Sequence, residues 1–187
     1  MPDAQEKARV STVNEAAIMK ETFAEFYEEF LPKVFRYIRY RVNAVQVTED
    51  LTSEVFEKAL TNFARFSSER ASFSTWIFTI ARNTVIDYYR GRGRHSAVSL
   101  EEAEVDVPSG ETPPDEELEK REEKERLQVC LARLTQQEQE LVSLKFGSGL
   151  NNRQIADITG LSESNVGTRL YRTVRKLRDM FAEAEHA

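Results

Sequence analysis

The chain has 187 residues, enough for one large or two small domains, and a formal net charge of −6. Its seven Gly and five Pro leave room for long uninterrupted helices, and its one Cys excludes an internal disulfide. No apolar run reaches the length of a membrane span, and the N-terminus has no secretory core segment. We therefore expect an all-α, cytoplasmic protein without membrane insertion.

The acidic residues are concentrated in the middle of the chain. Residues 99–125 hold twelve Asp and Glu against three Lys and Arg, whereas the segments on either side have a small positive net charge. Because each end carries basic patches of its own, the acidic balance of the whole chain does not exclude a nucleic-acid partner.

The first 20 residues have weak apolar periodicity and fit either a frayed terminus or a short helix, so we assign them no role. From Phe23 to Val42, aromatic and aliphatic residues follow helical spacing. This pattern predicts a long helix that Pro32 either kinks or divides. A second helix is expected to begin at Thr48 as its N-cap, with acidic residues in its first turn and an acidic, polar outward face.

A Ser-rich loop over residues 64–72 separates this helix from the next and leaves Phe66 in need of apolar cover. The third helix is expected to begin with Ser74 as its cap and to end in a cluster of arginines. Basic side chains among aromatic rings are typical of single-stranded nucleic acid binding, since guanidinium groups hold phosphates while exposed rings stack on bases. The same rings would equally serve the core of a three-helix domain.

Helix propensity falls after the arginine cluster, where Gly, Pro and carboxylates dominate. We therefore predict two small helical domains, residues 21–95 and 118–187, joined by a flexible acidic linker over 96–117 and preceded by an extension over 1–20. The sequence contains no phosphate-binding loop, nucleophile motif or clustered metal ligands. We expect no enzyme activity, no metal and no cofactor.

The second domain is expected to contain four helices. Cys130 lies in one apolar helical phase with neighbouring leucines and is predicted to be a core residue. Thr135 with Glu138, and Asn151 with Gln154, have the spacing of capping boxes, in which each side chain bonds the backbone N–H of the other residue. Each box predicts the start of a helix.

Residues 151–178 have the spacing of a helix-turn-helix. Ala156 allows close crossing of the first helix, Gly160 suits the positive φ of the turn, Ser162 can cap the second helix, and Val166 anchors it to the first. The outward face of this second helix, which can meet DNA, consists of Ser164, Asn165, Thr168, Arg169, Arg172, Arg175 and Lys176.

Four segments follow one another along the chain: FAEFYEEFLPKVFRYIRYRV, VTEDLTSEVFEKALTNFARF, FSTWIFTIARNTVIDYYRGRGR and, after the acidic stretch, LTQQEQELVSLKFGSGLNNRQIADITGLSESNVGTRLYRTVRKLR. This order resembles bacterial RNA polymerase sigma factors of the extracytoplasmic-function (ECF) group of the sigma-70 family, over most of the chain. The resemblance implies sigma domains two and four, without the extra domains of the housekeeping factor. It also implies a linker that threads through the polymerase towards the RNA exit path.

The partners that the resemblance implies are core RNA polymerase, promoter DNA as duplex and as melted strand, and commonly an anti-sigma factor. It implies that core polymerase is bound by Asp50, Glu54 and Glu57. It implies that the minus-ten element is bound by Phe66, Ser72, Phe73, Arg82, Asn83, Arg90 and Arg92. In domain four it implies that the major groove of the minus-thirty-five element is read by Ser164, Asn165, Thr168, Arg169 and Arg172, with Arg175 and Lys176 on phosphates.

Gly167 departs from the family pattern, which usually has Lys or Arg at this position. A glycine inside a helix costs about 0.5–1 kcal/mol relative to Ala and here also removes a cation. Either the promoter differs at this point, or the helix backbone approaches DNA closely.

One alternative function stays open at this stage. The chain could be a stand-alone helix-turn-helix transcriptional regulator whose N-terminal helices form a dimerisation or sensing module. Such a protein would bind duplex DNA by itself, as a dimer on symmetric half-sites, whereas a sigma factor should bind poorly until polymerase is present.

Overall fold

The computed structural model describes the backbone of residues 4–42, 44–95 and 114–185, and the side chains of residues 21–42, 44–91 and 123–183. All regular elements within these ranges are helical, which confirms the all-α prediction. Most of the predicted linker lies outside the described residues.

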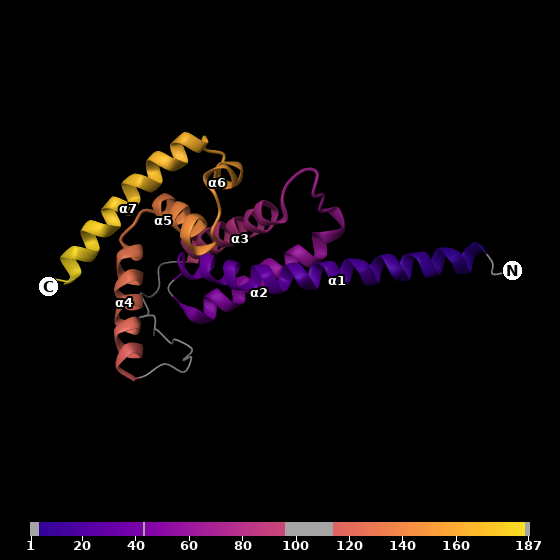
Figure 1. Ribbon diagram of the computed structural model, residues 1–187, viewed down its shortest axis with the longest axis horizontal. Helices are drawn as coiled ribbons and strands as arrows, with labels where there is room; N and C mark the ends of the chain where they lie inside the picture. Colours follow the sequence, from indigo (N-terminus) through magenta and orange to yellow (C-terminus); the bar gives the residue numbers. More distant parts are fainter. Residues whose placement is uncertain (1–3, 43, 96–113, 186–187) are drawn as a thin grey trace.

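The N-terminal half contains α1 (Ala4–Arg39), α2 (Val45–Asn62), a 3-10 helix η1 (Phe63–Arg65) and α3 (Phe73–His95). The C-terminal half contains α4 (Pro114–Ala132), α5 (Gln136–Val142), a π-helical segment η2 (Ser143–Gly147), α6 (Asn152–Thr159) and α7 (Glu163–Glu185). The helices of the first half pack against one another, and α7 contacts α4, α5 and α6 in the second. Figure 1 shows α1 extending away from the other helices towards the N-terminus. Pro32 lies inside α1, which also includes the predicted extension from Ala4 onwards.

Local cap chemistry sets the helix starts of the second half as predicted. The Glu138 amide donates to Thr135 Oγ1 at 3.3 Å, and the Thr135 amide donates to Glu138 Oε2 at 2.8 Å. In the second box, the Gln154 amide donates to Asn151 Oδ1 at 2.9 Å, and the Asn151 amide donates to Gln154 Oε1 at 3.0 Å. Gly160 follows α6 with φ 75°, in the left-handed region that favours glycine. Both capping boxes and the turn are therefore confirmed.

Two predicted helix starts in the first half are wrong. Thr48 is not the cap of α2, which begins directly after Ala44. Thr48 is instead buried inside the helix, where its hydroxyl donates to the Ala44 carbonyl at 2.9 Å, and the first turn carries no acidic residue. Ser74 does not cap α3, because Ser72 takes that place and its hydroxyl accepts from the Thr75 amide at 3.2 Å. A Ser or Thr hydroxyl can either cap a helix or donate to a carbonyl of the preceding turn inside a helix. Residue spacing alone does not distinguish these two uses.

The two halves share one connected hydrophobic core. α1 contacts η2, and α3 contacts α6. Fully buried residues of the same cluster come from both halves, among them Tyr37 and Phe78 from the first and Leu144 and Ile155 from the second. Cys130 is buried as predicted, in the second half. The sequence predicted two domains on a flexible linker and gave no sign of this contact between them.

Tyr37 is buried in this core, and its hydroxyl has no hydrogen-bond partner among the described residues. Burial raises the pKa of the phenol, so the group stays neutral. Because an unsatisfied buried hydroxyl is destabilising, we expect Tyr37→Phe to raise the free energy of unfolding by about 1 kcal/mol. The control is Tyr89→Phe, whose hydroxyl donates to the Arg41 carbonyl and whose loss should cost about 1 kcal/mol. Urea denaturation measures both, and a less stable Tyr37→Phe protein would contradict the expectation.

Candidate nucleic-acid and polymerase interfaces

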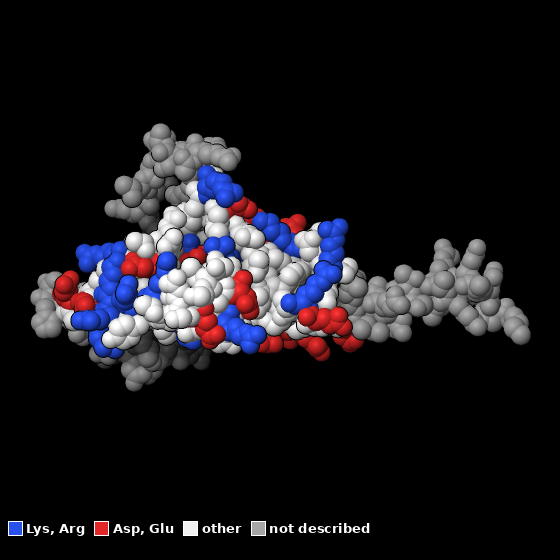
Figure 2. Space-filling model, turned by 90° about the horizontal axis from the view of Figure 1, so that it is seen from above, with Lys and Arg blue, Asp and Glu red and all other residues white. Residues whose placement is uncertain are grey.

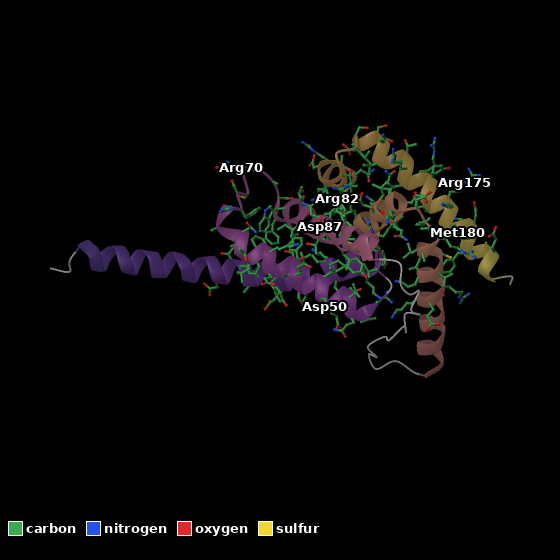
Figure 3. The ribbon with its side chains drawn as sticks, turned by 180° about the vertical axis from the view of Figure 1, so that it is seen from behind. Asp50, Arg70, Arg82, Asp87, Arg175 and Met180 are labelled. Carbon is green, nitrogen blue, oxygen red and sulfur yellow. The ribbon has the colours of Figure 1, made fainter. Side chains whose placement is uncertain are left out.

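The predicted outward face of α7 is at the surface. Ser162 caps the helix by accepting from the Asn165 amide at 3.3 Å, and buried Val166 and Leu170 fix its inner side. The exposed residues are Ser164, Asn165, Thr168, Arg172 and Arg175, while Arg169 and Lys176 are half-buried. Figure 3 locates Arg175 on α7, and Figure 2 shows Lys and Arg side chains gathered at that end of the molecule. An exposed, cationic helix that follows a tight turn is suited to a DNA groove.

Two of these cations are held by side chains of α5. Arg169 Nη1 donates to Gln137 Oε1 at 3.1 Å, and its Nε donates to Asn165 Oδ1 at 3.3 Å. Lys176 Nζ lies 2.9 Å from Glu138 Oε2, the carboxylate that also caps α5. Desolvation opposes the charge of Glu138, but hydrogen bonds, first among them that from Lys176, outweigh it and lower the pKa of this carboxyl. Arg169 is thus oriented on the outward face, whereas Lys176 is tied to the structure.

No described residue requires glycine at position 167. A Cβ there would lie 3.5 Å from Asn152 Nδ2, an ordinary contact distance, and the backbone is helical. One turn further along, Tyr171 is 70% exposed. The sequence analysis missed this ring, although it is out of phase with the buried Leu170 and four residues from Gly167, on the same side of the helix. Gly167 and Tyr171 are therefore part of the candidate DNA face.

Phe66 receives its cover from a cluster of rings at the start of α3. The half-buried Phe66 ring has its centroid 5.1 Å from that of Trp76, 5.5 Å from that of Phe73 and 6.1 Å from that of Phe63. Phe73 is buried and stacks on Phe26, with centroids 4.0 Å apart and planes 5° apart. Of the two phenylalanines predicted for the minus-ten element, Phe73 is buried and only Phe66 is partly exposed.

The other minus-ten candidates differ in their surroundings. Ser72 and Asn83 are exposed, and the Ser72 hydroxyl is engaged as the cap of α3. Arg90 is exposed, and its Nη1 lies 3.3 Å from Asp87 Oδ1. The side chain of Arg92 lies outside the described residues. Asn83 and Arg90 are therefore open to a partner from solvent.

Arg82 is directed at the C-terminal half. Its Nε lies 2.9 Å from Glu140 Oε1 of α5, and its side chain is 27% exposed. Figure 3 shows Arg82 on α3, apart from Arg70, which lies in the loop before that helix. Arg70 is exposed, and the sequence analysis did not select this cation, which follows Phe66 by four residues.

The predicted acidic face of α2 is also at the surface. Asp50, Glu54 and Glu57 are exposed, and Glu54 Oε1 lies 2.6 Å from Lys58 Nζ. Leu60 continues this face three residues after Glu57 and is 56% exposed. A large apolar side chain beside exposed carboxylates is suited to a protein partner.

Residues 4–42, 44–95 and 114–185 contain neither a membrane-spanning helix nor a candidate metal cluster. No helix in these ranges is long and apolar enough to cross a bilayer. No group of three or more His, Cys, Asp or Glu in the same part of the chain is arranged to hold a metal ion.

Both halves match models of one protein family. The model of Sigma-70 region 2 matches residues 26–95, and that of Sigma-70, region 4 matches residues 124–177. The ECF RNA polymerase sigma factor RpoE of Cereibacter sphaeroides is 30% identical over 156 residues, covering 83% of this chain and 84% of the relative. The ECF RNA polymerase sigma factor BldN of Streptomyces coelicolor is 34% identical over 157 residues, covering 84% of this chain but only 59% of BldN.

Solved structures share the fold. The sigma factor RpoE from Bartonella quintana, determined in complex with the anti-sigma factor NepR, aligns with a TM-score of 0.72 at 20% identity, covering 87% of this chain and 98% of that one. CnrH, determined in complex with the cytosolic domain of CnrY, aligns with a TM-score of 0.63 at 20% identity, covering 88% of this chain and 90% of that one. With both regions matched in order and 84% of a relative covered at 30% identity, the chain belongs to the sigma-70 family as an ECF-type RNA polymerase sigma factor.

Proposed function

We propose that this sigma factor binds core RNA polymerase through α2, recognises the minus-thirty-five element as duplex through α7, and takes the minus-ten element as melted strand around Phe66 and Asn83. In this proposal, residues 21–95 act as sigma domain two and residues 118–187 as sigma domain four, joined by the acidic linker. Melting needs a surface that stabilises an unstacked base and cations that hold the strand, since unpairing costs a few kcal/mol per step. No step requires a catalytic group or cofactor.

The observation that carries this proposal is the presence of three different binding surfaces in one chain. The exposed outward face of α7 is suited to duplex DNA, while the half-buried Phe66 ring, together with the exposed Arg70 and Asn83 of the same half, is suited to single strands. The exposed acidic face of α2 is suited to neither form of DNA, because both carry negative charge, and is therefore assigned to the protein partner, core polymerase. A stand-alone regulator needs only the first of these three surfaces.

Transcription reconstituted from purified parts tests the proposal. The purified chain is mixed with core RNA polymerase and a promoter library, and transcript starts are mapped. We expect defined starts that depend on the chain and share two upstream sequence elements. Failure to associate with core polymerase at low salt would refute it. Dimeric binding to symmetric duplex sites without polymerase would favour the stand-alone regulator instead.

The proposal includes an anti-sigma factor as a partner and the cytoplasm as the place of action. Two proteins of the same fold were determined in complexes: the sigma factor RpoE from Bartonella quintana with an anti-sigma factor, and CnrH with the cytosolic domain of CnrY. Core polymerase and chromosomal DNA are in the bacterial cytoplasm, so a protein that joins them acts there.

Arg169→Ala tests base reading by α7. If Arg169 contacts a base edge, the variant should lose about 1–3 kcal/mol of binding at one promoter position and relax specificity there. The matched control is Arg175→Ala, an exposed arginine expected on phosphate, which should weaken all promoters alike and lower the salt dependence of binding. Holoenzyme binding to a set of promoters with single substitutions measures both, and a uniform loss for Arg169→Ala would remove it from the specificity residues.

A further inference from the structure

The first turns of α7 carry a stretch without cations on the side that faces solvent. Ser164, Gly167 and Tyr171 recur at steps of three and four residues, so they line one side of the helix. Arg169 is held towards α5, where its Nη1 donates to Gln137 Oε1 at 3.1 Å. Because the first turns of a recognition helix contact base edges in the major groove, this stretch is placed where a promoter would be read.

The space that a side chain at position 167 would occupy is open. Outside its chain neighbours and the adjacent helix backbone, one described atom lies within 4 Å of a Cβ added to Gly167, namely Asn152 Nδ2 at 3.5 Å. The Tyr171 side chain therefore does not fill this space, and 70% of Tyr171 is exposed. Long side chains on a helix lean towards its N-terminus, so the Tyr171 ring borders the space above Gly167.

Folding of this half explains neither residue. The inner side of α7 is fixed by Val166 and Leu170, which are buried, whereas Tyr171 buries little of its ring. A glycine inside a helix is less stable than an alanine, and the described residues leave room for a side chain at Gly167. An exposed aromatic ring beside an open glycine is therefore better explained by a molecule that binds this surface.

The chemistry of the two residues favours one base. In the major groove, Lys and Arg donate to guanine O6 and N7, whereas an apolar group contacts the C5-methyl group of thymine. Gly167 has no donor to offer, and the absence of a Cβ lets a base edge approach the helix backbone closely. The Tyr171 ring is then the apolar surface beside that base edge.

We propose that Tyr171 is a specificity residue of this sigma factor, whose ring contacts the C5-methyl group of a thymine at the base pair that Gly167 faces. Gly167 contributes by leaving the base edge room to reach the ring. The position thus selects a T·A pair without a charged side chain. This inference rests on the proposed function, because it names a base contact within the α7 face that is assigned there to the minus-thirty-five element.

Exchange of thymine for deoxyuridine tests the contact, because it removes only the methyl group. A promoter is first selected from the library by the full chain with core polymerase, and each thymine of its minus-thirty-five element, on either strand, is then exchanged in turn. We expect one exchange to weaken holoenzyme binding about fourfold, the value of one buried methyl group. With Tyr171→Ala, the same exchange should change binding by less than about twofold, the usual limit for uncoupled groups.

Tyr171→Phe is the matched control for this variant. It keeps the ring and removes the hydroxyl, so the effect of the methyl group should remain about fourfold. If Tyr171→Phe loses the methyl effect as Tyr171→Ala does, the hydroxyl carries the contact, and the contact between ring and methyl group is overturned. Because Tyr171 is exposed, both variants should fold, which urea denaturation checks.

Gly167→Arg tests where the contact lies. The new side chain can donate to guanine, so the preference at the same base pair should move from T·A to G·C by about tenfold. The matched control is Ala132→Arg, which adds the same side chain at an exposed position on α4 and should leave the preference for T·A unchanged.

The outcomes separate this inference from the proposed function. A library that yields no defined starts, with intact core polymerase, would refute the proposed function and this inference with it. Defined starts without any thymine whose methyl effect depends on Tyr171 would overturn this inference alone. A Gly167→Arg holoenzyme that keeps the preference for T·A would overturn it as well.

Discussion

Phe73→Ala should lower the free energy of unfolding by about 3–5 kcal/mol, the usual cost of truncating a buried phenylalanine. Phe73 is buried, stacks on Phe26 and has its centroid 5.0 Å from that of Phe30 in an edge contact, so the variant leaves a cavity and breaks ring contacts at once. Urea denaturation measures the effect. A loss below about 1 kcal/mol would mean that the ring cluster collapses around the missing side chain.

Phe66→Ala is the matched variant. It makes the same chemical change at a half-buried ring that contacts Phe73. It should cost less stability than Phe73→Ala but reduce promoter opening, because a base stacked on an aromatic side chain gains about 1–3 kcal/mol. Opening is measured by permanganate reactivity of the melted strand with holoenzyme. If Phe66→Ala opens promoters normally, Phe66 belongs to the core alone.

Reversing Asp50 and Glu57 to Lys together should weaken binding to core polymerase on the order of 100-fold, or about 2.7 kcal/mol. Both carboxylates are exposed, and reversal would place cations where an opposite charge is expected on the polymerase, a juxtaposition that costs several kcal/mol. Because the positions are at the surface, the unfolding free energy should change by only about 0.5 kcal/mol per substitution. Fluorescence anisotropy with core polymerase measures the affinity.

The control for this pair is Glu25→Lys with Glu28→Lys, which makes the same change of charge at exposed positions on α1. It should leave core binding within about twofold of the unsubstituted protein, a difference of about 0.4 kcal/mol. If both double variants lose affinity equally, the effect reflects net charge and α2 is not the docking face. Leu60→Ala should add to the loss at α2 if the apolar side chain contacts the polymerase.

Sequence reasoning found the features that are settled within a few residues of each other. The capping boxes at Thr135 and Asn151, the left-handed turn at Gly160 and the outward face of α7 follow from cap chemistry and helical periodicity, which are local properties. Local chemistry was also ambiguous where one residue type has two uses. Thr48 could cap a helix or bond back to the preceding turn, and its burial in α2 decided for the second.

The sequence by itself thus determined an all-α chain, its helix-turn-helix and most of the residues that α7 presents to solvent. Only the tertiary structure decided that Phe73 is buried while Phe66 is partly exposed, because Phe73 stacks on Phe26, which lies on another helix. The same holds for the partner of Arg82, since Glu140 stands 58 residues away in the sequence. Periodicity tells which side of a helix is apolar, but it carries no information on which distant element comes to lie against that side. The contact between the halves therefore became visible only in three dimensions.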